Sequence, residues 1–344
     1  MPHDDVLSKL NHWEADESFY RDHYHAMRGG GSLEELLEGV DPTADYVDIA
    51  LHPENIDPVK VEDIFFMGDA NVALIKHPRF LPYFSHKHMF FEMAYVLSGS
   101  CKHIIDGKPE ILTQGDLCLI APNVSHGIEL NDDSILINIL VRYSTFIDIF
   151  LNTIRDKSKI ALFFLSSLYG KANIRYLLYR TGGDPVIQNY ILDMFHEQLR
   201  PDEYSDRINC SLLTIFFTQL TRRHGDKVMI PDSVTEKISY ADDMLGYILR
   251  HYSSVSLSSL AEEFHFSVPY CSKIIKEISG SSFSELLTNI RMQQGMNLLA
   301  HTQLSIADIS DHVGYKNPET FIRCFSRQYH MTPTQFRREA FART

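Results

Sequence analysis

The chain has 344 residues, a hydrophobic fraction of 44% and a formal net charge of −13 at pH 7. This length gives room for two or three domains with ordinary cores. No apolar signal stretch opens the sequence and no run approaches 18 apolar residues, so we expect neither secretion nor a membrane span. The 5 cysteines show no paired spacing, which favours a reducing, cytoplasmic setting.

Residues 1–60 form an N-terminal extension of acidic, mixed composition, to which the sequence assigns no role. Three consecutive glycines, Gly29–Gly31, precede a short helix predicted near Ser32–Leu37. Residues 1–240 carry 22 Lys/Arg against 35 Asp/Glu, so this part of the chain is not a nucleic-acid surface.

Residues 61–145 predict a small β-barrel. Short runs rich in β-branched and aromatic residues alternate with turn signals, and Asp106-Gly107 is typical of a two-residue hairpin turn. Many short strands at this spacing predict an antiparallel double-sheet barrel. The predicted strands are Val72–Ile75, Phe90–Leu97, Cys101–Ile105, Ile111–Leu112, Leu117–Ile120, Gly127–Leu130 and Ile135–Val141.

Candidate ligand residues lie within this predicted barrel. His86 and His88 alternate along one run and Glu92 follows four residues later, so all three point to one face of a regular strand. His126 directly precedes the later predicted strand Gly127–Leu130. Three imidazoles and one carboxylate are ligand types that suit Zn²⁺, Fe²⁺, Mn²⁺ or Ni²⁺.

The spacing resembles the cupin fold, whose first motif has two alternate histidines, a glutamate four residues on and a glycine seven beyond it. That motif is complete here, with Gly99 as its glycine. The second motif is matched in part: the distance from Gly115 to His126 is kept, but Ala121 and Asn123 replace the usual proline and glycine. The resemblance implies a cupin-like sensing barrel.

Three interpretations of the His/Glu cluster stay open at this point. It binds a divalent metal, it hydrogen-bonds an organic ligand without metal, or it is a satisfied structural cluster. Tyr83 and Tyr95 belong to a group of aromatics around it that are candidates for stacking on a sugar or another small ligand. Half of these aromatics must face the core of any small barrel.

Residues 146–225 return to helical periodicity. One apolar stripe runs from Ile187 to Leu199 and a second from Ile208 to Leu220. These stripes either pack on the barrel or form a homodimer seam. Residues 226–239, with Pro231 and little periodicity, are the predicted linker.

Residues 240–344 contain one helix-turn-helix pattern twice, about 49 positions apart. A helical stretch from Ser284 to about Leu299 joins the copies, and at about 1.5 Å per residue it spans roughly 25 Å. Such a pair of units is suited to contact DNA at two places that lie one helical turn apart, a distance of about 34 Å. The predicted N-caps of the four helices are Ser256, Ser267, Ser305 and Asn317.

This segment resembles the DNA-binding domain of the AraC/XylS family of bacterial transcription regulators. Two departures from the family pattern stand out. His330 stands where the family usually has Gly and is expected to strain a left-handed turn, and Gly295 stands where it usually has Ala and should loosen the connector helix by about 1 kcal/mol. The matching motifs are Gly280–Phe283, Arg291, Leu298-Leu299, Ile306–Ser310, Val313–Tyr315 and Thr332–Arg337.

By this resemblance, one face of the second helix in each copy contacts DNA. Residues 241–344 carry ten Lys/Arg and ten Asp/Glu, so the placement of charge matters more than its sum and non-specific affinity should be modest. Lys276 and Arg327 are expected to meet phosphate. The base-facing positions are Pro269, Ser272, Lys273, Glu319, Thr320, Ile322 and Arg323.

These patterns predict an α+β multidomain protein, with an N-terminal antiparallel cupin-like β-barrel and accessory helices followed by an all-α double helix-turn-helix domain. The resemblance implies a non-enzymatic transcription activator, homodimeric, whose partners are double-stranded DNA, a small-molecule effector and RNA polymerase. Two other interpretations stay open. One is a metal-dependent cupin enzyme that carries a DNA-binding domain, and the other is a regulator controlled by a protein partner through an unliganded barrel.

Overall fold

The computed structural model describes residues 2–29, 32–38, 40–41, 43–53, 65–66, 68, 70–143, 145–146, 149, 160, 163, 167, 174–230 and 235–342. The chain divides into two compact units, which are described separately: one holds residues 1–149 and 175–231, and the other holds residues 150–174 and 232–344. No helix within the described ranges is long and apolar enough to cross a membrane.

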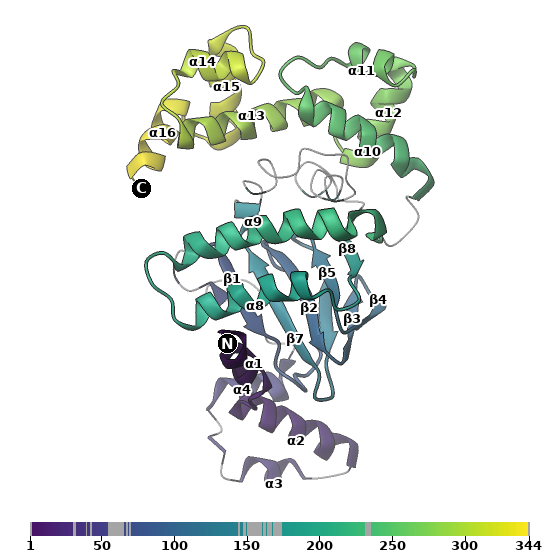
Figure 1. The fold of residues 1–344 in the computed structure, drawn as a ribbon, viewed down its shortest axis with the longest axis vertical. Coiled ribbons are helices and arrows are strands. Elements are labelled where there is room, and N and C mark those ends of the chain that lie inside the picture. The colour runs from purple at the N-terminus through teal and green to yellow at the C-terminus, as the bar shows by residue number, and fades with distance from the viewer. Residues whose placement is uncertain are drawn as a thin grey trace. The chain divides into compact units, whose positions relative to one another are not determined.

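The first unit is built around a barrel of two antiparallel sheets (Figure 1). The larger sheet has the strand order β1-β7-β2-β5-β8 and the smaller has the order β4-β3-β6. The predicted double-sheet barrel and fold class are therefore confirmed. The strands are β1 (Val72–Lys76), β2 (Phe91–Ser98), β3 (Ser100–Ile105), β4 (Lys108–Thr113), β5 (Asp116–Ile120), β6 (His126–Glu129), β7 (Ile135–Val141) and β8 (Tyr176–Arg180).

Close approaches of neighbouring residues explain both glycines of the cupin motifs. A Cβ on Gly99 would lie 1.9 Å from the hydroxyl oxygen of Ser134, and one on Gly115 would lie 2.1 Å from the backbone nitrogen of Gly183. Both glycines also have positive φ angles, +77° and +85°. Larger residues would therefore clash and strain the backbone at both positions.

Strand β8 corrects the sequence prediction, which gave helical structure throughout residues 146–225. Tyr176–Arg180 instead pair antiparallel with β5 at the edge of the larger sheet. A short apolar run fits a buried strand as well as a buried helix, so periodicity alone could not decide. Most of residues 144–173 lie outside the described part of the chain.

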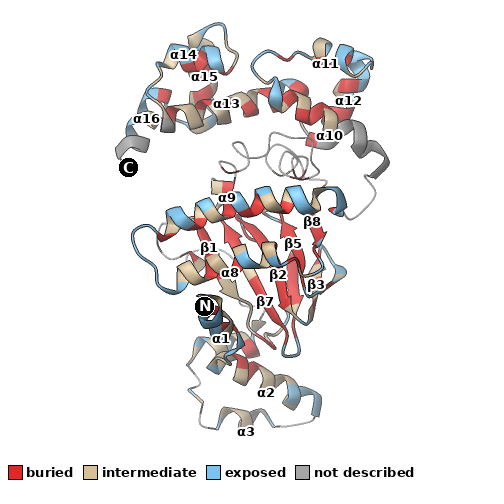
Figure 2. Ribbon diagram, viewed as in Figure 1, coloured by how far each residue is buried: buried red, intermediate tan, exposed pale blue. Residues whose placement is uncertain are grey.

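Helices α8 (Pro185–Leu199) and α9 (Ser205–His224) pack on each other and cover one face of the larger sheet (Figures 1 and 2). The first predicted stripe is buried at Ile187 and Ile191, which are fully covered, whereas Leu199 at its end is 37% exposed. The second stripe divides, because Phe216 and Leu220 are buried whereas Ile208 is 40% and Ile215 is 44% exposed. Part of α9 therefore presents apolar side chains to solvent.

The N-terminal extension is mainly helical, with α1 (Pro2–Asn11), α2 (Ala15–Gly29), α3 (Leu33–Leu37) and α4 (Asp45–Leu51). A buried ion-pair network holds α2 to the barrel. Glu17, 1% exposed, accepts hydrogen bonds from the backbone N–H and Nε of Arg79, both at 3.1 Å, and from Nζ of Lys76 at 2.7 Å. The Arg79 guanidinium lies 3.9 Å from the centre of the Trp13 ring.

The described part of the second unit is helical. Helix α10 (Thr235–Arg250) begins inside the predicted linker of residues 226–239, and Met229 of that range pairs with Leu178 of β8. Residues 231–234 lie outside the described part. The helices are α10 (Thr235–Arg250), α11 (Leu257–Glu263), α12 (Val268–Ser279), α13 (Phe283–His301), α14 (Ile306–His312), α15 (Pro318–Tyr329) and α16 (Pro333–Ala342).

Candidate functional site

The first helix-turn-helix is formed by α11 and α12, and its ends are fixed by side-chain caps. Ser256 accepts a hydrogen bond from the backbone N–H of Ser259, and Ser267 accepts one from that of Tyr270, as predicted. Cys271, Ile274 and Ile275 bury one face of α12. The predicted DNA-facing residues occupy the other side: Pro269, Lys273 and Lys276 are exposed and Ser272 is half-buried.

The second helix-turn-helix, α14 and α15, repeats this construction. Ser305 caps α14 and Asn317 caps α15. Phe321 and Phe325 bury one face of α15 in a core with Met292, Leu299, Ile309 and Val313. On the remaining surface Glu319, Arg323 and Arg327 are exposed, Thr320 is half-buried, and Ile322 packs partly against the core.

A junction that sequence reasoning missed ties the two helix-turn-helix units together beside their shared helix α13. Arg291 of α13 donates hydrogen bonds to the carbonyl oxygens of Tyr252 at 2.8 Å and Ser253 at 3.0 Å, and its guanidinium lies 5.4 Å from the centre of the Tyr315 ring. A Cβ on Gly314, whose φ is +92°, would lie 2.1 Å from the Ser253 oxygen. The turn of the second helix-turn-helix, at Gly314, therefore packs directly against Ser253, which precedes the first helix-turn-helix.

Both departures from the family pattern have a visible structural setting. His330 ends α15 in the left-handed conformation, with a φ of 56°, where the equivalent end of α12 has Gly280. Gly295 is buried in α13, and a Cβ there would lie 2.7 Å from Cε2 of Phe321. The missing side chain at Gly295 therefore leaves room for the Phe321 ring on α15.

In the barrel, the structure brings the four candidate ligands together. One ligand atom from each of His86, His88, Glu92 and His126 lies within 4.8 Å of the others. His86 and His126 are joined through their backbones at 2.9 and 3.0 Å. His86 is half-buried and the other three side chains are buried. The predicted convergence is thus present, and His86 is the member nearest to solvent.

Hydrogen bonds fix the ring orientations in this cluster. Nδ1 of His88 lies 2.9 Å from the carbonyl oxygen of Phe90, and Nδ1 of His126 lies 3.0 Å from that of Val124. Because a carbonyl only accepts, each Nδ1 carries the hydrogen and donates. The two Nε2 atoms then face one atom, Oε2 of Glu92, at 2.9 and 3.3 Å.

This geometry fits a cation. In neutral rings of that tautomer, both Nε2 atoms present lone pairs to a carboxylate oxygen, which requires positive charge between them, either as protons or as a metal ion. A histidine that donates its other N–H to a backbone carbonyl is also the usual arrangement of a metal ligand. The buried Nδ1 of His86 has no hydrogen-bond partner among the described residues. The donor set suits a divalent transition metal.

The pKa values of the cluster agree with this need for positive charge. Burial raises the pKa of Glu92, but hydrogen bonds and charges from His126 and His88 outweigh it and hold the pKa well below the usual range. Burial lowers the pKa of His126, but Glu92 outweighs it and the pKa is raised. Burial, reinforced by the His126 charge, lowers the pKa of His86 and of His103 to about 3, so both are neutral at physiological pH.

The two aromatic candidates lie elsewhere. The Tyr95 side chain is on the opposite face of β2 from Glu92, and its hydroxyl donates to Oε1 of Gln188 on α8 at 3.3 Å. Tyr83 is 39% exposed and lies where a Cβ on Gly127 would point, away from the neighbouring His126. Neither tyrosine joins the four-residue cluster.

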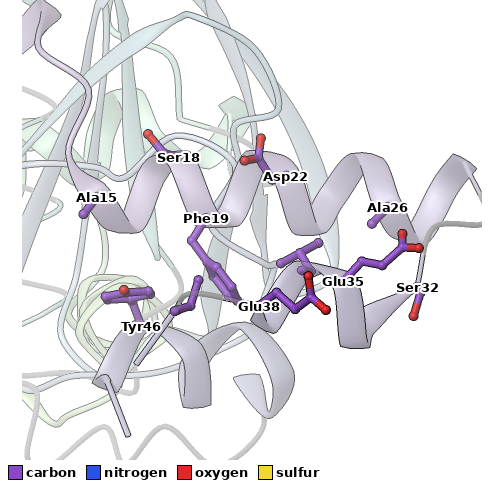
Figure 3. Close-up of a pocket in the computed structure, with 11 residues that line it drawn as sticks. Ala15, Ser18, Phe19, Asp22, Ala26, Ser32, Glu35, Glu38 and Tyr46 are labelled. Atoms are coloured by element: carbon purple, nitrogen blue, oxygen red, sulfur yellow. The ribbon is translucent and has the colours of Figure 1, made fainter. Parts of the chain in front are cut away.

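A separate cavity of about 530 Å³ lies among α2, α3 and α4 (Figure 3). The Phe19 and Tyr46 rings line it with centroids 5.5 Å apart, and Asp22, Glu35 and Glu38 give it an acidic wall. None of its lining residues was predicted to bind a ligand.

Comparisons with known proteins decide the family. A helix-turn-helix domain model matches residues 260–339, which include both helices predicted to face DNA, α12 and α15, and a cupin domain model matches residues 76–141, which include the whole cluster. The chain belongs to the AraC/XylS family of transcription regulators and has an N-terminal cupin domain.

Some relatives of this AraC-family regulator match most of its length, and others match its C-terminal part alone. The HTH-type transcriptional activator RhaS of Escherichia coli O157:H7 is 22% identical over 276 residues, which is 80% of this chain and 95% of that relative. Among solved structures, the C-terminal domain of the two-component response regulator yesN from Fusobacterium nucleatum is 32% identical, covers 29% of this chain and 99% of its own, and has a TM-score of 0.28. ToxT from Vibrio cholerae is 17% identical, with coverage of 77% and 97% and a TM-score of 0.29.

Proposed function

We propose that this AraC-family regulator activates transcription when its cupin domain binds a small-molecule effector. The observation that carries the proposal is the pairing of two capped helix-turn-helix units on one shared helix in a chain whose barrel gathers three histidines and a glutamate. The barrel has a sensing role in this proposal and no catalytic one. RNA polymerase is the partner expected of an activator.

For DNA binding, we propose that α12 and α15 enter two successive major grooves. Lys273 and Arg323 contact base edges, and Lys276 and Arg327 contact phosphates. All four side chains are exposed. Nζ of Lys273 lies 3.8 Å from Oε1 of Glu277, and this ion pair would break when Lys273 binds DNA. The junction at Arg291 sets the distance between the two helices and with it the spacing of the two half-contacts.

For sensing, we propose that His86, His88, Glu92 and His126 hold a divalent metal. When bound, the metal supplies the positive charge that the cluster needs and an open position for an oxygen atom of the effector. The protein residues orient the ligand set through the carbonyl oxygens of Phe90 and Val124, which fix the two histidine tautomers.

For assembly, we propose a homodimer whose seam includes the exposed apolar face of α9. Ile208 and Ile215 lie seven residues apart on this helix, and both are well exposed although their neighbours Phe216 and Phe217 are buried. Seven residues is two helical turns, so the two isoleucines lie on one stripe. A second copy of the chain would cover them.

The test begins with native mass spectrometry of full-length protein taken directly from cells, which identifies any metal or organic molecule that travels with it. An operator is then selected from random DNA, and its footprint should show two protected regions one helical turn apart. We expect a strong chelator, or His88→Ala, to abolish effector-dependent transcription while operator binding persists. His196→Ala, on α8 and outside the cluster, is the matched control.

The possible results separate the competing interpretations. A response that survives chelation but fails in the His88 variant would mean an organic ligand bound without metal. An unchanged response in alanine variants of all four cluster residues would remove the sensing role and leave control by a protein partner. Turnover of a substrate by the metal-loaded protein would contradict the non-catalytic role.

A further inference from the structure

The barrel interior contains more unpaired polar atoms than the four-residue cluster explains. Within the described residues, nine buried side-chain nitrogen and oxygen atoms have no hydrogen-bond partner. Six of them lie in the barrel. The hydroxyl of Tyr179 is on the face of the larger sheet that carries Tyr95, and the other five atoms belong to four residues: Nε2 of His77, Nδ1 of His86, both ring nitrogens of His103 and Oδ1 of Asn138. Buried polar groups normally find partners, so this concentration points to a ligand.

Strand register places these residues on the wall around the cluster. Ile105 pairs with His126 and His103 pairs with Ile128, so His103 and His126 are diagonal neighbours on one face of the smaller sheet, with ring centroids 5.6 Å apart. On the larger sheet, Asn138 pairs with Ala94, two residues from Glu92. Asn138 and Glu92 therefore share one face.

His77 extends the same wall. Its backbone N–H donates to the carbonyl oxygen of Leu136 at 2.9 Å, which continues the β1–β7 pairing by one residue. Asn138 keeps part of its surface accessible although the other residues of β7 are buried. His103 is 0% exposed and its nitrogens lie outside the group whose ligand atoms are all within 4.8 Å. His103 is therefore placed to contact a molecule bound to the metal, not the metal itself.

The unpaired atoms also define the chemistry of that molecule. A neutral imidazole offers one N–H donor and one acceptor nitrogen, and an amide oxygen needs a donor, so hydroxyl groups, which both donate and accept, satisfy this wall. A divalent cation with one glutamate has a net charge of +1, and a buried charge needs a counter-charge. A carboxylate on the ligand supplies it.

We propose that the effector is a small hydroxycarboxylate, whose carboxylate lies at the metal and whose hydroxyl hydrogen-bonds to His103 and Asn138. This inference rests on the proposed metal-dependent sensing and names its ligand class. It assigns His103, Asn138 and His77 to the effector site, none of which the spacing of the cupin motifs identifies.

Three matched probes test the proposal on the full chain loaded with Co²⁺: glycolate, acetate, which lacks the hydroxyl, and ethylene glycol, which lacks the charge. Binding is followed by calorimetry and by the visible absorption of Co²⁺. We expect glycolate to bind more tightly than either of the others. His103→Leu should weaken glycolate about tenfold or more, as expected for a lost hydrogen bond to a charged ligand, and acetate much less.

Metal affinity distinguishes a His103 that contacts the effector from a His103 that coordinates the metal. Co²⁺ binding should be unchanged in His103→Leu and in the control His196→Ala, and lost in His88→Ala. Equal glycolate affinity in the parent and His103→Leu, or no preference for glycolate over acetate, overturns the proposal. A failure of the full chain to bind Co²⁺ also overturns it. In that case, operator binding and the transcriptional response still test the proposed function independently.

A stability measurement tests whether His103 has only a structural role. Since Leu removes two unpaired buried nitrogens, the metal-free His103→Leu protein should melt at the same temperature as the parent or higher. A clearly lower melting temperature would show that these nitrogens have partners in the metal-free protein and would overturn the assignment.

Discussion

Replacing Gly295 with alanine tests how α15, the second helix predicted to face DNA, is positioned. Alanine is favoured over glycine in a helix interior by about 1 kcal/mol, so propensity alone predicts that Gly295→Ala stabilises α13. The structure predicts the opposite result. The new Cβ would lie 2.7 Å from Cε2 and 2.9 Å from Cζ of Phe321.

The magnitude follows from these distances. The closer contact is roughly 0.8 Å inside the optimal carbon–carbon separation of about 3.5 Å, and Phe321 is 0% exposed, so its ring has little room to move. Overpacking of this kind costs about 1–3 kcal/mol. After the gain in helix propensity, we expect the free energy of unfolding to fall by up to about 2 kcal/mol.

Function should respond as well, because Phe321 lies between Thr320 and Ile322, two of the predicted base-facing residues. A displacement of α15 should weaken binding to the operator and leave non-specific DNA binding unchanged. Stability can be measured by urea unfolding of residues 235–344, which have their own buried core and which we expect to fold alone. Affinity is measured on the full chain at matched salt.

A double-mutant cycle isolates the contact. Phe321→Leu shortens the opposing side chain, so the Gly295→Ala/Phe321→Leu double variant should lose less stability than the sum of the two single variants. If Gly295→Ala raised stability by the full propensity term and kept operator affinity, or if the two changes were simply additive, the reasoning about this contact would be wrong.

The remaining predictions concern DNA contact, the N-terminal network and assembly. Arg323→Ala or Lys273→Ala should cost about 1–3 kcal/mol at the operator and relax base preference in one half-site, whereas Lys276→Ala should weaken all DNA alike, as footprinting and salt-matched titrations would show. Glu17→Gln should lower the free energy of unfolding at pH 7 by about 3–5 kcal/mol, because it leaves buried positive charge unpaired. Burial raises the pKa of Glu17, but hydrogen bonds from the neighbouring Arg and Lys outweigh it and lower the pKa to about 2, so this contribution is present above about pH 4.5 and the deficit of the variant should shrink as pH falls toward 2 in acid melts. Ile215→Asp should shift the protein from dimer to monomer in sedimentation; a dimer that persists at micromolar concentration would exclude this seam.

Features set by neighbours in the sequence were predictable. Ser256, Ser267, Ser305 and Asn317 cap their helices because an N-cap needs only a short polar side chain beside free N–H groups of its own turn. The convergence of His86, His88 and Glu92 was predicted from strand alternation and that of His126 from motif spacing; the residues do converge, although His86 and His88 precede β2 and are not part of it. In these cases the interacting residues lie close together along the chain or within one recognisable pattern.

Features set by long-range contacts were not predictable. From the sequence, Gly295 was expected only to weaken its helix. The reason for a glycine there was not visible, because the Phe321 ring that fills the space belongs to another helix, 26 residues away. Tyr95 was predicted as a ligand residue although its odd spacing from Glu92 already put it on the other face of the strand; its contact there, Gln188 on α8, is the part that the sequence could not identify. His103 was overlooked because no motif includes it; its inward alternation with Cys101 and Ile105 was the available signal.

The distribution of unsatisfied buried polar groups differs between the helix-turn-helix unit and the barrel, and this difference fits their two roles. In the helix-turn-helix unit, the N-terminal ends of α11, α12, α14 and α15 are capped by their own sequence, so these helices keep their shape without a ligand. The barrel instead retains buried imidazole and amide atoms that lack partners among the described residues. A ligand that satisfies them binds only the folded barrel and therefore stabilises it in proportion to the logarithm of its concentration. Within the described residues, two such atoms lie in the helix-turn-helix unit, Nδ2 of Asn297 and Nε of Arg337, against six in the barrel. The part that must respond to a signal is thus the part that more unpaired groups leave incomplete without a ligand.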